Sequence, residues 1–489
     1  MAARFLLPHN AGALENTGPY LPSKSATLPR AYVDCGARPR TRKLWRAEVS
    51  STGIRRAAPL CSAAAAKRGE YDVVIVGAGI IGLTVARQFL IGSDLSVAVV
   101  DARVPCSGAT GAGQGYIWMA NKTPGSDTWE LACRGKQLWE DLAESIRRQG
   151  MDPLRVLGWM KTGSLLIGRT SGELSMLQKR VKMLNEAGLK AEYLSASALA
   201  SREPSLDIGP QTGAAFLPDD CQLDALRAVS FIEQGNRSFV PEGRYAEFFN
   251  DPAVCLVRST ENGEVEAVQT SQNILCGRRA VVIATGAWSG FLDRTFMNTE
   301  ATLDVPVEPR KGHLLLLENL DGVRLNHGLM EVGYVDHQVS SRLPDSSSSR
   351  ATAVEHNFSS ISFTATTDHM GNLLLGSSRQ FSGFDVEVDD AIIKRIWERA
   401  GEFLPTLREI PLNFSTEKQI RIGLRPYVPD GKPIIGPIPG IPKALFATGH
   451  EGGGLCMALS TAEMVVDMVL GNGGKIDHSP FSVRGRCCV

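Results

Sequence analysis

The run Tyr71-Asp72-Val73-Val74-Ile75-Val76-Gly77-Ala78-Gly79-Ile80-Ile81-Gly82 is the most informative part of this 489-residue chain. Its first half is apolar and β-branched, which is typical of a buried parallel strand. Its second half is a GxGxxG motif, and the largely apolar residues 83–90 that follow it predict a helix. The run therefore predicts a strand, a glycine turn and a helix, which form the first half of a βαβ unit.

The residues that follow complete this unit. Residues 96–100 predict a second strand that ends at Asp101, and this acid follows the motif at about the 20-residue spacing of a ribose-binding acid. Gly77 permits the tight turn, Gly79 lets the backbone approach a pyrophosphate, and Gly82 lets helix and strand pack closely. The helix N-terminus offers free N–H groups to the phosphates. The predicted dinucleotide-binding residues are Gly77, Ala78, Gly79, Ile80, Ile81, Gly82, Asp101 and Ala102. The alternative is a βαβ unit whose glycines serve packing alone.

Three further glycine-rich elements are spread along the chain. Residues 107–115 form a loop just beyond Asp101, residues 280–288 resemble a strand that ends in a glycine turn, and residues 444–454 resemble another, followed by a helix over 455–470. Loops of this kind direct backbone N–H groups at phosphate or ring oxygens. Elements so far apart in the sequence can converge on one long cofactor. The motif by itself leaves FAD and NAD both open.

From about residue 71 to 478 the chain resembles the FAD-dependent oxidoreductase family of D-amino acid oxidase, glycine oxidase, sarcosine oxidase and D-hydroxyproline dehydrogenase. The matching segments, in the family's order, are Gly77–Gly82 with Asp101, Ser107–Gly115, Val281–Trp288, Pro309–His313, Gly371–Gly376, Gly423–Pro433 and Gly449–Gly454. The resemblance implies FAD as the cofactor.

The resemblance also implies the fold class, which is α/β. It consists of a Rossmann-like FAD-binding domain and an interleaved α+β substrate domain with a large antiparallel sheet. We expect the FAD-binding domain to comprise residues 68–165, 216–300 and 415–478. The substrate domain then comprises residues 166–215 and 301–414, with a flexible insertion over 336–360 that contains four consecutive serines.

Further cofactor-binding residues follow from the resemblance. They are Ser107, Gly108, Thr110, Gly113, Gln114, Gly115, Val254, Thr285, Gly286, Gly423, Glu451, Gly452, Gly453, Gly454 and Leu455, and Val254 would contact the adenine through its backbone. Some relatives tether FAD through a cysteine near the position of Arg425, or through a histidine in the first glycine loop, where this chain has Ala112. Because neither residue is present here, we expect non-covalent FAD.

Three residues are expected to serve the substrate side of the site. Arg425 resembles the arginine with which glycine oxidase and its relatives hold a substrate carboxylate, and a guanidinium can bind a carboxylate bidentately. Tyr427 lies two residues further on. By the resemblance, His450 belongs to a turn at the pyrimidine side of the flavin, although it can instead bond the backbone. Glycine oxidases place a second arginine where this chain has Gly452, which suggests a different selectivity. We find no catalytic triad and no metal-binding spacing.

The expected function is FAD-dependent oxidation of the C–N bond of an amino acid, with a D-amino acid, a D-proline-like or an N-methyl or glycine-like substrate. The electron acceptor would be oxygen or a quinone-type carrier. The alternatives are an NAD-dependent dehydrogenase and a non-catalytic flavoprotein scaffold. Oxidation of this kind moves a hydride equivalent to the flavin N5, so the protein mainly positions the reactants and binds charge.

Composition narrows the possible partners and the location. The chain has 52 basic and 52 acidic residues, a balance that argues against general nucleic-acid binding. Its ten cysteines contain no CxxC pair, which disfavours a zinc ribbon. The sequence contains no uninterrupted apolar run of about 18 residues, so it predicts no transmembrane segment. Residues 1–67 are basic, poor in acids and rich in Ser, Ala and Pro, as in organelle transit peptides, and we favour the chloroplast over the mitochondrion.

Overall fold

The computed structural model describes residues 67–487, apart from 293, 299–302, 319, 321, 336–359, 411 and 413–417. The leader predicted for residues 1–67 lies outside the described residues except at Lys67, and the predicted insertion 336–360 does so except at Ser360. The described residues form two eight-stranded sheets and one small two-stranded sheet.

The first sheet contains the predicted βαβ unit. Its strands run in the order β17-β18-β11-β1-β2-β8, and β10 and β9 extend from β11. The pairs β8–β2, β2–β1, β1–β11 and β11–β18 are parallel. The bounds are β1 (Lys67–Val76), β2 (Val97–Val100), β8 (Tyr245–Phe248), β9 (Ala253–Arg258), β10 (Val265–Thr270), β11 (Asn273–Ile283), β17 (Ile434–Pro437) and β18 (Ala444–Thr448).

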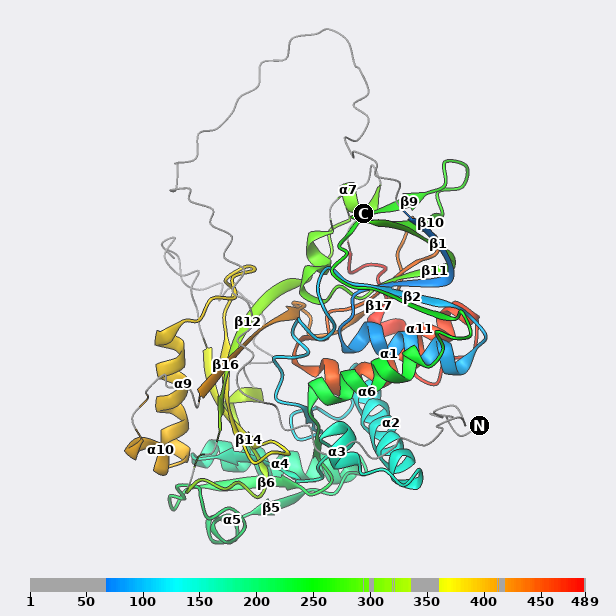
Figure 1. Ribbon diagram of the computed structural model, residues 1–489. Helices are drawn as coiled ribbons and strands as arrows, with labels where there is room; N and C mark the ends of the chain where they lie inside the picture. The colour runs from blue at the N-terminus through cyan, green and yellow to red at the C-terminus, as the bar shows by residue number, and fades with distance from the viewer. Residues whose placement is uncertain are drawn as a thin grey trace, which may run out of the picture. The chain divides into compact units, whose positions relative to one another are not determined.

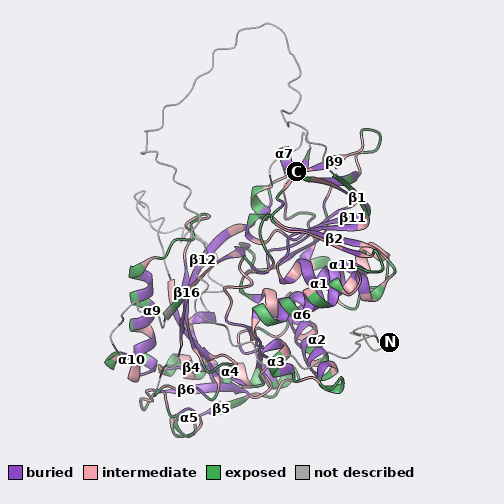
Figure 2. Cartoon of the chain, viewed as in Figure 1, coloured by how far each residue is buried: buried purple, intermediate pink, exposed green. Residues whose placement is uncertain are grey.

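Both faces of this sheet are covered, which explains the continuous apolar run in β1. Val73 and Ile75 pack into a core with the helices, whereas Val74 and Val76 pack with residues of β9 and β10 on the other side. Figure 1 shows α1 (Ile80–Gly92), α6 (Ala225–Arg237) and α11 (Gly454–Leu470) together below the sheet, with α2 (Trp129–Arg148) beside them. The strands β2, β10, β11, β17 and β18 are buried along most of their length (Figure 2).

The second sheet is mostly antiparallel and has the order β16-β12-β15-β14-β13-β4-β6-β5. Only the pair β13–β4 is parallel among the pairs that the structure describes in it. The bounds are β4 (Ser164–Gly168), β5 (Glu192–Leu194), β6 (Gly213–Leu217), β12 (Glu308–Leu317), β13 (Gly328–Glu331), β14 (Ser360–Thr367), β15 (Leu373–Arg379) and β16 (Lys418–Tyr427).

One face of the second sheet packs against α9 (Asp390–Phe403), whose apolar residues recur every three or four positions. The other face, near β12 and β16, turns toward the first sheet (Figure 1). The strand β16 is part of the second sheet, and this moves the predicted domain boundary at residue 415. We assigned residues from 415 onward to the FAD-binding domain, but β16 pairs with β12 along its whole length and therefore belongs to the second sheet.

The remaining elements connect or flank these sheets. They are β3 (Tyr116–Ile117), β7 (Cys221–Gln222), α3 (Pro153–Leu157), α4 (Ser171–Glu186), α5 (Ala196–Arg202), α7 (Arg294–Met297), α10 (Thr406–Glu409) and the 3-10 turns η1 (Gly286–Phe291), η2 (Glu451–Gly453) and η3 (Ser479–Phe481). Local signals fix some of their ends. In α4, for example, Thr170 and Glu173 form a capping box.

The C-terminal helix is unusually apolar. Among the described residues one helical stretch, Glu451–Leu470, is long and apolar enough to cross a membrane by length and composition. Its residues Cys456–Val466 are buried, and the helix packs against α1 and α2. The packing of a core helix therefore accounts for its composition.

Candidate active site

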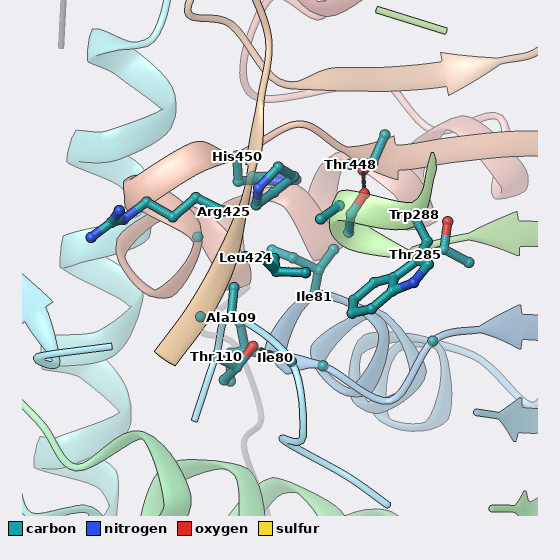
Figure 3. Close-up of a pocket in the computed structure, with 18 of the residues that line it drawn as sticks. Ile80, Ile81, Ala109, Thr110, Thr285, Trp288, Leu424, Arg425, Thr448 and His450 are labelled. Carbon is teal, nitrogen blue, oxygen red and sulfur yellow. Dashed lines mark hydrogen bonds between the residues drawn. The ribbon is translucent and has the colours of Figure 1, made fainter. Parts of the chain in front are cut away.

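A cavity of about 570 Å³ lies where the two sheets meet. Segments from the whole length of the chain contribute to its wall, including the first glycine turn, the loop 107–115, the end of β11, β16 and the turn before α11. Figure 3 shows Ile80 and Thr110 on one side of this space, Thr285 and Trp288 on another, and Arg425 and His450 at the end formed by β16. The separate glycine elements thus share one site.

Most of the predicted residues line this cavity. They are Gly77, Gly79, Ile80, Ile81, Asp101, Ala102, Ser107, Gly108, Thr110, Gly113, Gln114, Gly115, Thr285, Gly286, Gly423, Arg425, His450, Glu451, Gly452, Gly454 and Leu455. Five predicted residues are not part of its wall: Ala78, Gly82, Val254, Tyr427 and Gly453.

The first glycine turn is shaped by close backbone contacts. Gly77 has a φ of +117°, and a Cβ there would lie 2.4 Å from the carbonyl oxygen of Ala284. A Cβ on Gly82 would lie 1.9 Å from the carbonyl oxygen of Gly77. Gly82 therefore acts through the packing of α1 against β1 rather than by contact with a ligand. These contacts hold the start of α1 at the cavity.

Asp101 ties the second strand to this turn. Its Oδ2 accepts a hydrogen bond from the Ala78 N–H at 2.7 Å, and its Oδ1 accepts one from the Arg103 N–H at 2.8 Å. A carboxylate has about four lone-pair positions, so Asp101, which also lines the cavity, can still accept from ribose hydroxyls.

The loop 107–115 links the two sheets. The Oγ1 of Thr110 accepts a hydrogen bond from the Ile80 N–H at 3.2 Å, at the start of α1. Gln114 reaches the second sheet, where its Oε1 accepts from Thr364 at 2.8 Å and its Nε2 donates to the Leu374 carbonyl at 3.1 Å. Tyr116 donates to the same Oε1. Burial raises the pKa of Tyr116 well above its usual range, so this hydroxyl stays protonated.

Hydroxyl groups join the ends of β11 and β18 at the cavity. Ser289 Oγ lies 2.9 Å from Thr285 Oγ1 and 2.7 Å from Thr448 Oγ1. Thr448 also donates to the Gly286 carbonyl at 3.1 Å. This network fixes the carboxyl ends of two parallel strands, which is where open α/β sheets bind their ligands.

Val254 and Tyr427 are not part of the cavity wall. The side chain of Val254 is exposed, and its neighbours Pro252 and Ala253 line the cavity instead. Tyr427 is buried behind the wall, where its ring packs against Phe381 at 5.1 Å between centroids. We therefore withdraw Tyr427 from the residues that would touch a substrate.

His450 is a buried neutral residue of the wall. Its Nε2 forms a hydrogen bond with the side-chain hydroxyl of Thr461 on α11, at 2.9 Å, and not with a backbone group. Burial lowers the pKa of His450 to about 3, so the imidazole is uncharged at neutral pH. His450 thus holds the turn before α11, and the helix N-terminus behind it points a partial positive charge at the cavity.

Arg425 occupies the position expected for a carboxylate-binding residue. It is half-buried, lines the cavity and donates from Nη1 to the Ser378 carbonyl at 3.0 Å. Its guanidinium lies flat over Gly312, where a Cβ would be 2.2 Å from Nη1. The remaining guanidinium donors are available to a ligand in the cavity.

Sequence reasoning assigned no role in the site to four residues around Arg425. Arg310 and Arg379 are buried close by, and Tyr116 and Tyr334 line the cavity. The ion pair between Arg310 Nε and Glu451 Oε1 spans 3.4 Å. Burial raises the pKa of Glu451, but the positive charges of Arg310, Arg425 and Arg379 outweigh this and lower it overall. Arg310 stands between Glu308 and Lys311, ahead of the apolar residues 314–317, so no local pattern singled it out.

The geometry fits a bound FAD. The cavity extends from Asp101 past the N-terminus of α1 to the N-terminus of α11, and both helix ends suit anionic groups such as a pyrophosphate or a reduced flavin ring. Among the described residues, no group of three His, Cys, Asp or Glu side chains is placed to hold a metal ion. A dinucleotide slot that ends beside an arginine defines the class as a redox enzyme with a nucleotide cofactor.

Comparison with known proteins gives the family. Residues 72–468 match the family described as FAD dependent oxidoreductase (DAO), and the chain belongs to it. The protein is therefore an enzyme whose cofactor is FAD. The two sheets described above, with their helices, are consistent with an α/β fold of two domains.

Individual relatives are distant. The chain is 25% identical over 454 residues to hydrogen cyanide synthase subunit HcnC of Pseudomonas protegens, which covers 85% of this chain and 96% of the relative. It is 26% identical over 414 residues to glycine oxidase of Bacillus licheniformis, with 84% and 96% covered. The solved structure of glycine oxidase from Geobacillus kaustophilus superposes with a TM-score of 0.69 at 21% identity, over 85% of this chain and 99% of that one.

Proposed function

We propose that the protein oxidises the C–N bond of an amino acid. The observation that supports this most directly is Arg425, a half-buried guanidinium that lines the cavity and, among the described residues, donates one hydrogen bond, from Nη1 to the Ser378 carbonyl. An arginine in such a position binds the α-carboxylate bidentately and so fixes the α-carbon. The names of its relatives, glycine oxidase among them, support an amino acid as substrate.

The reaction takes a hydride equivalent from the α-carbon and a proton from the nitrogen, which leaves an imine that water hydrolyses. FAD, when bound, supplies the acceptor for the hydride. The chain's own residues bind and orient the substrate. Arg425 holds the carboxylate, and the N-terminus of α11 stabilises negative charge at its end of the cavity. Oxygen or a quinone-type carrier would then take up the electrons.

Anaerobic spectroscopy of the full-length protein tests this function. Purified protein should be yellow, and the flavin absorption band should bleach when a D-amino acid, D-proline, sarcosine or glycine is added without oxygen. Bleaching by one of these classes identifies the substrate class. A yellow protein that none of these amines bleaches would refute amine oxidation. Acid precipitation of the same sample should release the flavin, since we predict non-covalent FAD.

We also propose that the leader directs the protein to the chloroplast rather than the mitochondrion. In residues 1–67 basic side chains far outnumber the acids Glu15, Asp34 and Glu48, and serine and alanine are frequent. A fusion of residues 1–67 to a fluorescent protein should accumulate in plastids. Accumulation in mitochondria or in the cytosol would contradict this proposal.

A further inference from the structure

Three arginines stand together on the cavity side of the second sheet. Arg425 on β16, Arg310 on β12 and Arg379 on β15 belong to three adjacent strands, and Arg310 lies directly opposite Arg425 in the register. Side chains two residues apart on a strand share a face. Gly312 and Ser377, which line the cavity, therefore place Arg310 and Arg379 on the cavity face of their strands, but of the three arginines only Arg425 is part of the cavity wall.

The positive charge of this cluster is not balanced within the described part of the chain. Glu451 is its one carboxylate partner, at 3.4 Å from Arg310, and none of the described carboxylates lies within ion-pair distance of Arg379 or Arg425. Three cations and one anion leave two positive charges. Like charges directly opposite each other in a sheet are destabilising, and buried charges are normally paired.

The two missed arginines are also short of hydrogen-bond partners. Arg310 is 4% exposed and Arg379 is 5% exposed, and the Nη2 atom of each has no hydrogen-bond partner among the residues that the structure describes. Aromatic rings cover both guanidinium groups, with Tyr427 at 5.0 Å from Arg310 and Tyr334 at 4.1 Å from Arg379. A ring attracts a cation but accepts no strong hydrogen bond and carries no net charge. An anionic group of a ligand would accept hydrogen bonds from these donors and would balance the excess positive charge.

We propose that the substrate is a dicarboxylic amino acid, whose α-carboxylate binds Arg425 and whose second carboxylate binds Arg310 and Arg379. This inference rests on the proposed amino-acid oxidation and specifies its substrate class. Two carboxylates match the two unbalanced positive charges, and Tyr334, which lines the cavity under Arg379, holds that guanidinium in place. The second carboxylate can belong to the side chain, as in aspartate, or to a substituent on nitrogen, as in iminodiacetate.

Pairs of acids and their amides isolate the second charge, because the two members have nearly the same shape. We would measure anaerobic flavin reduction in the FAD-loaded full-length protein with D-aspartate and D-asparagine, D-glutamate and D-glutamine, and iminodiacetate and its monoamide. In at least one pair the acid should have a kcat/KM higher by about ten- to a hundredfold, as expected for hydrogen bonds to a charged group. The pair that shows the preference identifies where the second carboxylate is attached.

Other outcomes separate the two claims. If neutral amino acids reduce the flavin and no acid is preferred to its amide, the inference is wrong while amino-acid oxidation stands. If no amine reduces the flavin, both claims fail.

Two variants assign the preference to residues. Arg310→Gln and Arg379→Gln should each raise KM for the diacid while changing KM for the amide little, so that the preference falls at least severalfold. Arg421→Gln is the matched control, since Arg421 is also on β16 but lines a separate small cavity, and it should leave the acid-to-amide ratio unchanged. If both variants kept the full preference for the acid over its amide, Arg310 and Arg379 would not be the residues that bind the second carboxylate.

A binding measurement covers the case in which a variant does not fold. Malonate and succinate cannot be oxidised at a C–N bond, so their effect on the flavin absorption spectrum reports binding alone. In the wild-type protein each should bind about tenfold more tightly than its monoamide. Equal affinities would contradict a site for two carboxylates.

Discussion

Replacing Arg425 with methionine should lower kcat/KM for amino-acid oxidation by about a hundredfold or more, because two charge-assisted hydrogen bonds to the substrate carboxylate are lost. The loss should fall mainly on KM, since the guanidinium binds the substrate before and during the reaction. Methionine keeps much of the side-chain volume over Gly312, so the packing of β16 on β12 should survive. Steady-state kinetics at saturating acceptor measure the effect.

FAD content and a matched variant complete this experiment. The Arg425→Met protein should retain its flavin spectrum, and Arg421→Met, with the same change on the same strand, should stay close to the wild-type kcat/KM. Wild-type kinetics in the Arg425→Met protein would show that the carboxylate is bound elsewhere.

Replacing Gly82 with alanine should remove most of the bound FAD. The added Cβ would lie 1.9 Å from the Gly77 carbonyl oxygen, so α1 must move away from β1 and its N-terminus must leave the cavity. Overpacking of this kind lowers the free energy of unfolding by about 1–3 kcal/mol. The ratio of flavin to protein absorbance and the thermal unfolding temperature report the two effects.

Gly92 provides the control on the same helix. A Cβ there would meet Gln88 Nε2 at 3.8 Å, an ordinary contact, and Gly92 lies at the C-terminal end of α1. Gly92→Ala should therefore keep both FAD and stability, with alanine also the better helix former. Full FAD occupancy in Gly82→Ala would contradict the packing role of this glycine.

Local patterns made the cofactor half of the site predictable. Strand, glycine motif, helix and Asp101 follow one another within a short segment, and each has a direct physical task in binding a dinucleotide. The convergence of residues 107–115, 280–288 and 444–454 on one cavity was anticipated from glycine turns at strand ends. These features arise from residues that are close together in the chain, so they can be recognised in the sequence alone.

The substrate half depends on strand pairing and was only partly visible. Arg310 faces the site because β12 pairs with β16 so that Arg310 lies opposite Arg425, and a shift of one residue would turn it to the α9 side. Arg379 joins them because β15 pairs with the other edge of β12. The same pairing moved β16 out of the predicted FAD-binding domain. Tyr427 was misplaced because adjacency to Arg425 in sequence does not give adjacency to the cavity.

A non-oxidisable carboxylate offers the simplest probe of a cation beside the flavin. Benzoate would be titrated into the FAD-loaded wild-type protein and into the Arg425→Met variant while the flavin absorption band is recorded. We predict a saturable change of the band in the wild-type protein and an affinity at least about tenfold weaker in the variant, which should still hold FAD. An unperturbed band in the wild-type protein, or equal affinities in the two proteins, would mean that Arg425 does not bind a carboxylate next to the flavin.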